Sequence, residues 1–358
     1  MSLVKGTSIL RKTNELRILK LLRTNQAETR QDIAKLTGLG KNTVSVIIDS
    51  FLNDGIVEEV GSVNDLTVGR PKRIISLIPS ALKTIAIKID RTKIRFFLFD
   101  YTNTEIENKT LENINSSDIN EVSKVLKEEI TRFDKDNSGI VGVGVTLTGI
   151  INSDEGVVIK STPLNWENVN LKRIIGEFFD GNIYILSNVR ALGLINPYTK
   201  DEESIYYIRI RRGIGGALIV NSQINFGKTW VAGEIGRIPI SFENNLKLEQ
   251  VLNEKQVLWE LENVESKESV YKEKSEILGL LVENLIYILN PGVIVLDSVY
   301  CDNDTFLNFL KGYLERNIDS SLLNETNIIT MYGGQEEHPE KGVSLLVINQ
   351  FEKINLER

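Results

Sequence analysis

The sequence predicts a mixed α/β fold in which a small helical head precedes a larger body of strands and helices. Two observations predict this division. Short amphipathic helical patterns occupy the first part of the chain, whereas β-branched apolar runs alternate with helical patterns in the rest. Residues 1–79 hold 12 Lys and Arg against 8 Asp and Glu, yet the whole chain has a net charge of −7. A basic head on an acidic body is typical of a polyanion-binding module joined to another kind of domain.

Composition limits the classes of protein to consider. At 358 residues the chain is long enough for two or three domains, each with its own core. It has no apolar run near the ~20 residues of a membrane helix and no signal-peptide pattern, so we expect a cytoplasmic protein without a membrane partner. Cys301 and His338 are the only residues of their kinds, which excludes a disulfide framework and a cysteine zinc site.

Three helices are predicted in the head. The first covers Asn14–Leu22, where apolar residues recur at helical spacing. Thr29 and Asp32 form a capping-box pattern at the start of a second helix, Arg30–Leu36. A turn with two glycines separates it from a third helix, Lys41–Asn53. Two short helices joined by such a turn predict a helix-turn-helix, whose second helix enters the DNA major groove.

Two strands are predicted after the third helix, Ile56–Val60 and Arg73–Ile78, around a basic loop with Gly-Arg-Pro at 69–71. This order predicts a winged helix-turn-helix, and a three-helix bundle with a solvated loop is the alternative. An extended Arg beside Pro suits a narrow minor groove. The predicted DNA-binding residues are polar or basic and free of the apolar stripe: Arg30, Gln31, Lys41, Asn42, Thr43, Ser45, Arg70, Lys72 and Arg73.

A glycine-rich segment marks the predicted functional part of the body. Apolar runs at Tyr206–Ile210 and Ala217–Val220 flank a turn with Gly213, Gly215 and Gly216. Glycines there fit a loop that brings backbone N–H groups to a phosphate, or a hairpin turn that needs positive φ. Downstream, Gly233-Glu234-Ile235-Gly236-Arg237 sets a carboxylate and a guanidinium between glycines, as a polar ligand requires.

These motifs resemble the ROK family (repressors, open reading frames and sugar kinases), whose members carry GIGGG followed by GEIGH. The head, with its Gly-Arg-Pro wing, resembles that of the family's repressors. The resemblance covers most of the chain and implies a winged helix-turn-helix in residues 1–79. Behind it the family's two-lobed, actin-like and sugar-kinase-like body has ribonuclease H-like lobes. The implied first lobe is 80–197 plus about 338–358, and the second, for effector binding and dimerisation, is 198–337.

Several positions depart from the family's kinases. Alignment with the kinase motifs places Asn188 at the catalytic Asp that deprotonates the sugar, and an amide cannot accept that proton. Lys88 replaces the Asp that helps to hold the metal. Arg211 replaces a residue of the nucleotide loop, and Asp297-Ser298 replace glycines beside adenosine. The departures predict a protein that is not an enzyme and has no catalytic residue.

The resemblance implies a sugar pocket formed by Asn165, Asn188, Glu234, Arg237 and Glu249. Trp166 fits either stacking on a sugar or the core. The family's cysteine-rich zinc segment is absent, so we expect no metal and no cofactor. The chain is thus expected to be a sugar-responsive transcriptional repressor of carbohydrate genes. Its expected partners are operator DNA, a sugar or polyol effector, and further copies in a homodimer or dimer of dimers. An ATP-dependent sugar kinase and a DNA-binder with a vestigial pocket are the alternatives.

Overall fold

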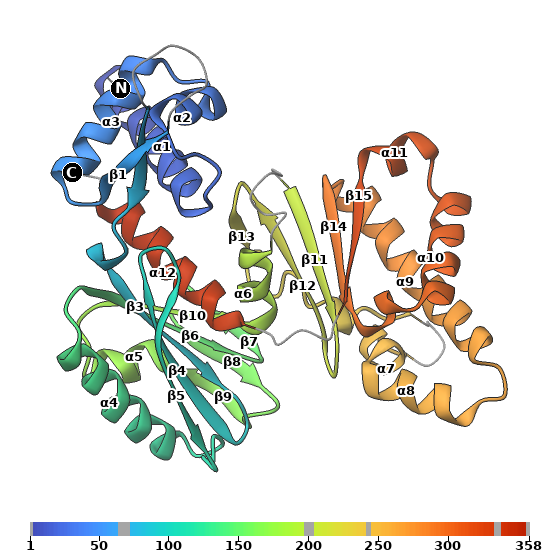
Figure 1. The fold of residues 1–358 in the computed structure, drawn as a ribbon. Coiled ribbons are helices and arrows are strands. Elements are labelled where there is room, and N and C mark those ends of the chain that lie inside the picture. Colours follow the sequence, from blue (N-terminus) through green and yellow to red (C-terminus); the bar gives the residue numbers. More distant parts are fainter. Residues whose placement is uncertain (1–2, 64–71, 197–203, 241–244, 333–337, 356–358) are drawn as a thin grey trace. The chain divides into compact units, whose positions relative to one another are not determined.

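The computed structural model describes residues 3–63, 72–196, 204–240, 245–332 and 338–355 (Figure 1). The chain divides into two compact units. The first unit holds residues 1–149, 153–186 and 343–358, and the second holds residues 150–152 and 187–342. The mixed α/β class is confirmed, whereas the three domain ranges expected above remain predictions.

The head is a winged helix-turn-helix, as predicted. Its elements are α1 Leu3–Arg23, α2 Arg30–Thr37, α3 Lys41–Asn53, β1 Val57–Val63 and β2 Lys72–Leu77. The Thr29 hydroxyl accepts from the Asp32 N–H, and Asp32 accepts from the Thr29 N–H at 3.0 Å, which completes the predicted capping box. Gly38 ends α2 at φ +71°, where a side chain would be strained. The antiparallel strands β1 and β2 lead to the wing tip, residues 64–71, which lies outside the described residues.

The core of the head is continuous with that of the body behind it. Ile18, Ile33 and Ile47 bring one apolar face of each helix together, and Ile75 of β2 closes the cluster. The same cluster includes Tyr101, which directly follows the strand Lys93–Asp100, and Ile348, which lies on the C-terminal helix Pro339–Asn355. Burial of a shared apolar surface therefore holds the head on the body.

A buried ionic group lies at the same junction. Arg23, the last residue of α1, donates to the carboxylate of Glu352 and, at 3.1 Å, to the amide oxygen of Asn349. The Tyr101 hydroxyl donates to the same Glu352 oxygen at 2.7 Å, and its ring lies 5.4 Å from the Arg23 guanidinium carbon. Burial raises the pKa of Glu352, whereas Arg23 and Tyr101 act in the opposite direction.

The first unit contains a five-stranded sheet of order β10-β6-β3-β4-β5. Strand β3 is antiparallel to β4 and parallel to β6, while β4 is antiparallel to β5. Their bounds are β3 Lys83–Ile89, β4 Lys93–Asp100, β5 Glu105–Glu112, β6 Ile140–Leu147 and β10 Asn182–Ser187. A hairpin of β8 Val157–Ser161 and β9 Trp166–Asn170 adds to this unit, and β7 covers Ile150–Asn152.

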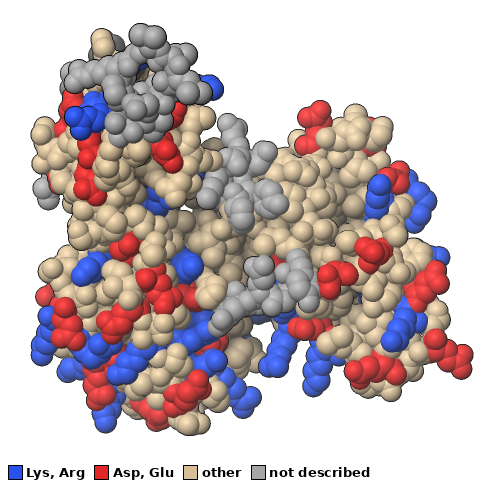
Figure 2. Space-filling model, in the orientation of Figure 1, with Lys and Arg blue, Asp and Glu red and all other residues tan. Residues whose placement is uncertain are grey.

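Helices α4 Ile119–Asp136, α5 Leu171–Gly176 and α12 Pro339–Asn355 accompany this sheet. Gly142 and Gly144 let α12 approach closely, because a Cβ at either would lie 2.8 Å from Val347 or Val343. The surface around α4 mixes both signs of charge (Figure 2), and Lys109 and Arg132 both pair with Glu129 there.

The second unit repeats this strand order with different residues. Its sheet has the order β13-β12-β11-β14-β15, with β11 antiparallel to β12 and parallel to β14. The bounds are β11 Ser204–Ile210, β12 Ile214–Val220, β13 Gln223–Asn225, β14 Val293–Ser298 and β15 Asn327–Tyr332. In both sheets the first three strands in the chain form an antiparallel meander, and the fourth pairs in parallel with the first. The expected duplication of ribonuclease H-like lobes is thus present in the topology.

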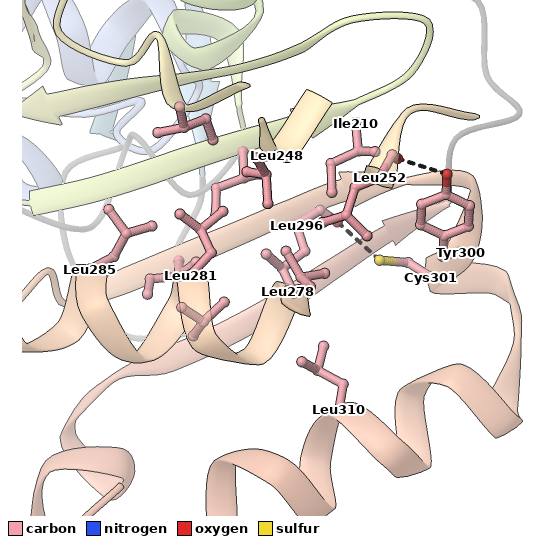
Figure 3. Packing of buried hydrophobic residues seen from close by; sticks show 14 of the residues in the cluster. Ile210, Leu248, Leu252, Leu278, Leu281, Leu285, Leu296, Tyr300, Cys301 and Leu310 are labelled. Atoms are coloured by element: carbon pink, nitrogen blue, oxygen red, sulfur yellow. Dashed lines mark hydrogen bonds between the residues drawn. The ribbon is translucent and has the colours of Figure 1, made fainter. Parts of the chain in front are cut away.

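Helices cover both faces of the second sheet. On one face, α6 Asn188–Ile195 packs through Leu192 against Tyr207 and Ile219. On the other, α9 Lys267–Leu289 places Leu278, Leu281 and Leu285 against the sheet (Figure 3). This core also includes residues of the remaining helices, α7 Leu248–Leu252, α8 Glu254–Asn263, α10 Asp304–Asn317 and α11 Ser320–Glu325. Among the described residues no helix is long and apolar enough to span a bilayer.

The glycine-rich segment forms a hairpin, in which β11 and β12 pair antiparallel around residues 211–213. Gly215 and Gly216 lie inside β12 instead of in a turn, and none of the three glycines has positive φ. Close packing explains Gly216, because a Cβ there would lie 2.8 Å from the ring of Tyr206. The predicted hairpin is therefore present, but its glycines do not have the expected positive φ, and the space taken up by neighbouring groups accounts for Gly216.

Candidate functional sites

A polar groove on the head gathers five of the predicted DNA-binding residues. It is lined by Thr29, Arg30, Gln31, Lys41, Ser45, Glu59 and Arg73. These residues come from the starts of α2 and α3 and from the two wing strands, so local capping and hairpin geometry bring them together. Asn42 and Thr43 are exposed on the first turn of α3. Lys72 begins β2, and Arg70 lies outside the described residues.

Arg30 is tied within this groove. Its guanidinium donates to the Asp49 carboxylate at 2.7 Å and to the Ser45 carbonyl at 3.2 Å, both on α3. Glu59 lies 3.6 Å from the same guanidinium and 3.7 Å from that of Arg73. Arg30 therefore connects α2 to α3, and the two cations offset carboxylates that would otherwise repel a phosphate backbone.

The exposed face of α3 also carries an apolar residue that the sequence analysis did not select. Val46 is 60% exposed and lies one turn after Asn42, whereas Val44, Ile47 and Ile48 are buried. The pattern of polar residues could not indicate it. The sequence does contain a signal for this residue, because Val46 lies outside the i, i+3, i+4 apolar stripe of the predicted recognition helix and is therefore expected to be exposed.

Four of the five predicted effector residues belong to the second unit. Asn188 begins α6, and Glu249 lies in the first turn of α7. Glu234 precedes the 3₁₀ turn Ile235–Arg237, and Arg237 is its last residue. Arg237 donates to the Glu234 carboxylate at 3.2 Å. The Glu249 carboxylate accepts a long hydrogen bond, 3.4 Å, from the N–H of Ile214.

Glycines bring these segments into contact. The Gly216 N–H donates to the Gly233 carbonyl at 2.7 Å, and a Cβ on Gly233 would lie 2.1 Å from the Gly216 oxygen. A Cβ on Gly236 would lie 2.9 Å from the Glu249 carboxylate. The segment Gly233–Arg237 thus packs on the start of β12 and beside Glu249, and three predicted polar groups share one surface of the unit.

Asn165 belongs to the first unit, where it is exposed at φ +56° just before β9. Trp166 beside it is buried and its indole N–H has no hydrogen-bond partner among the described residues. Its burial favours the core role over stacking on a ligand. Among the described residues, no group of three or more His, Cys, Asp or Glu could hold a metal ion.

Arg211 and Asp297, two of the positions that depart from the kinase motifs, are bonded to each other. The Arg211 guanidinium donates to the Asp297 carboxylate at 2.6 Å and to the Asp297 carbonyl at 3.1 Å. The Tyr207 hydroxyl donates to the other carboxylate oxygen, and burial together with Asp297 raises the pKa of Tyr207. The adjacent parallel strands β11 and β14 bring these residues together. A buried ion pair occupies this part of the second unit.

The fold and the two surfaces define a class: a winged-helix head on a body of duplicated ribonuclease H-like topology, with a cluster of polar groups in the second unit. Comparison with known families agrees. Residues 84–248 match the ROK family, and residues 11–58 match a winged helix-turn-helix DNA-binding family. The chain thus carries a ROK family domain behind a winged helix-turn-helix domain.

Relatives of both kinds, regulators and kinases, share parts of this architecture. The xylose repressor of Bacillus subtilis is 25% identical over 97% of this chain and 98% of its own length. The DNA-binding transcriptional dual regulator NagC of Escherichia coli is 22% identical over 66% of this chain and 60% of its own. Among solved structures, a ROK family transcriptional regulator, a homologue of the E. coli MLC protein, has a TM-score of 0.77, 16% identity and coverage of 97% and 98%. The ROK hexokinase of Thermus thermophilus has a TM-score of 0.60, 16% identity and coverage of 76% and 99%.

Proposed function

We propose that this protein is a sugar-responsive DNA-binding repressor that does not phosphorylate its ligand. The observation that carries the proposal is the polar groove of the winged helix-turn-helix head, lined by Gln31, Lys41, Ser45 and Arg73. Relatives that match the whole chain, head included, are named as a repressor and a transcriptional regulator, whereas the hexokinase matches about three quarters of it. Because its proposed target is operator DNA, we expect the protein to act in the cytoplasm.

The head reads DNA through the first turns of α3. Lys41, Asn42, Thr43 and Ser45 lie where a recognition helix meets base edges in the major groove. Asn42 suits adenine, and Val46, one turn later, suits the methyl group of thymine. Gln31 and Arg73 border the same groove and suit phosphate contacts, which fix the register. The predicted wing residues Arg70 and Lys72 complete the proposed interface, while Arg30 contributes by fixing α3.

The second unit binds a sugar or polyol through Asn188, Glu234 and Glu249, with Arg237 beside Glu234. Asn165 of the first unit remains a predicted effector residue. Carboxylate and amide groups are suited to hydroxyls. Asn188 cannot act as a general base. The buried Arg211–Asp297 pair occupies positions that align with the nucleotide-binding motifs of the family's kinases. A ligand that prefers one conformation of the body shifts the population of DNA-binding states only by its differential affinity for the two.

A homodimer fits this function, because winged-helix readers act on paired half-sites. Helix α9 buries one face in the core but exposes Leu280, Tyr287 and Ile288. We assign this face to the dimer. Tyr287→Ala combined with Ile288→Asp is expected to reduce the mass in sedimentation to that of one chain, and an unchanged dimer would contradict the assignment.

The experiment that tests the function is selection of a binding site from random duplex DNA by the purified protein, followed by titration with D-xylose, N-acetyl-D-glucosamine and other sugars. We expect one enriched sequence and its release by one sugar class. Enrichment of no sequence would refute DNA recognition. ATP-dependent phosphorylation of any sugar in the panel, abolished by Asn188→Ala, would instead establish the kinase.

A further inference from the structure

The loop that carries Glu234 has an irregular backbone. It runs from Phe226, directly after β13, to the 3₁₀ turn Ile235–Arg237. Gly227, Trp230 and Gly233 have φ of +66°, +59° and +90°. Left-handed backbone is unusual for a residue as large as tryptophan and persists only where the surroundings enforce it.

The loop has few apolar contacts of its own to enforce that conformation. Lys228, Thr229 and Val231 are exposed. On one side, the Gly216 N–H of β12 holds the carbonyl of Gly233. The opposite anchor is a charged side chain, Arg190.

Arg190 lies on α6, two residues after Asn188, and is 2% exposed. Its Nη2 donates to the carbonyls of Trp230 and, at 3.1 Å, Ala232. Its guanidinium carbon lies 5.1 Å from the centre of the Phe226 ring. One side chain thus contacts the loop at its beginning, middle and end.

Burial of this guanidinium is costly, and its contacts are directed at the loop backbone. Among the described residues Arg190 has no ion pair within 4.0 Å, and its Nη1 has no hydrogen-bond partner. Burial lowers the pKa of Arg190, while the charge of Glu234 acts in the opposite direction. Helix α6 itself is held to β12 by apolar packing, since a Cβ on Gly193 would lie 2.9 Å from Ile219. The helix therefore has no need of a buried charge for its own attachment.

We propose that Arg190 is a positioning residue, which fixes the loop Phe226–Glu234 and so places the Glu234 carboxylate for the effector. The effector part of this inference rests on the proposed function; the loop-fixing part does not. Arg190 does not touch the ligand. Asn188 and Arg190 both lie on α6. A ligand bound by Asn188 and Glu234 therefore links this helix to the loop that Arg190 already contacts.

Hydrogen–deuterium exchange of the full chain tests the loop-fixing part. Arg190→Met keeps the length of the side chain and removes its donors, and we expect exchange in residues 226–237 to rise about tenfold or more. Exchange in β11 and β14 should stay unchanged. Arg190→Lys, which retains charge and one donor group, should restore part of the protection. Arg132→Met is the matched control, since Arg132 also lies over a phenylalanine ring, at 4.1 Å, but far along the chain on α4.

Unchanged exchange in residues 226–237 of Arg190→Met would overturn the proposal. A rise spread over the whole second unit would also overturn it, because Arg190 would then serve general stability. Sugar binding is measured separately with D-xylose and N-acetyl-D-glucosamine by calorimetry, where Arg190→Met should weaken binding about tenfold. If the unaltered protein binds no sugar, the proposed function falls, while the exchange result still decides whether Arg190 fixes the loop.

Discussion

Removing either partner of the buried Arg23–Glu352 pair should destabilise the protein, because the remaining charge stays buried. Arg23 and Glu352 side chains are only 6% and 5% exposed. Breaking such a pair costs about 3–5 kcal/mol. After Glu352→Leu, Arg23 keeps Asn349 at 3.1 Å and the Tyr101 ring, so we expect a value near the lower end, about 3 kcal/mol. Replacing both, as Arg23→Met with Glu352→Leu, should recover most of the loss, because no charge is then left unpaired.

The pH dependence of the stability of Arg23→Met is a second, independent test of the buried pair. Burial already raises the pKa of Glu352, and removal of Arg23 takes away a group that lowers it. A carboxyl whose pKa is higher folded than unfolded contributes most stability below its unfolded pKa and loses it as pH rises through the folded value. Arg23→Met should therefore be less destabilised at pH 5 than at pH 8.

Urea unfolding followed by circular dichroism at both pH values measures these free energies. Lys311→Met is the control, since its pair with Glu315 is exposed and such pairs contribute about 0–1 kcal/mol. A loss below about 1 kcal/mol for both single variants, with no pH dependence, would refute the account of a buried pair.

Three further predictions concern the loop and the head. Gly233→Ala should lower stability by at least about 1–3 kcal/mol from backbone strain at φ +90°, and an unchanged thermal midpoint would contradict it. Val46→Ala should weaken binding to the selected DNA about fivefold, and replacing the contacted thymine by uracil should then have no added effect in gel shifts. Additive losses would exclude the methyl contact. Arg73→Ala should reduce the slope of log affinity against log salt by about 1, and equal slopes would place Arg73 off the phosphates.

The head could be predicted almost to the residue because its signals are local. The Thr29–Asp32 capping box and the apolar stripe of Lys41–Asn53 depend on neighbours within one or two turns. Helix α1 was predicted from Asn14, yet it begins at Leu3. Its first turns have no strong apolar pattern, and a helix boundary is the weakest part of such a prediction.

The body shows what a one-dimensional pattern omits. Arg211 and Asp297 each depart from the kinase motifs in the sequence, but their hydrogen bond depends on the pairing of two strands and joins residues 86 apart in the chain. The lack of room for a side chain at Gly216 results from the ring of Tyr206, which lies beside it only in the folded state. The role of Arg190 could not be predicted, because a lone arginine within an apolar segment has no spacing that indicates a function. Each of these features depends on tertiary contacts between residues that are not neighbours in a local sequence pattern.

The apolar cluster that joins Ile18 and Ile75 to Tyr101 and Ile348 limits how this protein can be cut or recombined. Residues 1–82 expressed alone would present to water the surface that normally faces the C-terminal helix. A chimaera that transfers this DNA-recognition specificity to another body must therefore bring α12 and the end of β4 with it. A stop codon a few residues upstream of Glu352 would weaken the proposed operator binding, although it lies near the opposite end of the sequence from the recognition helix α3.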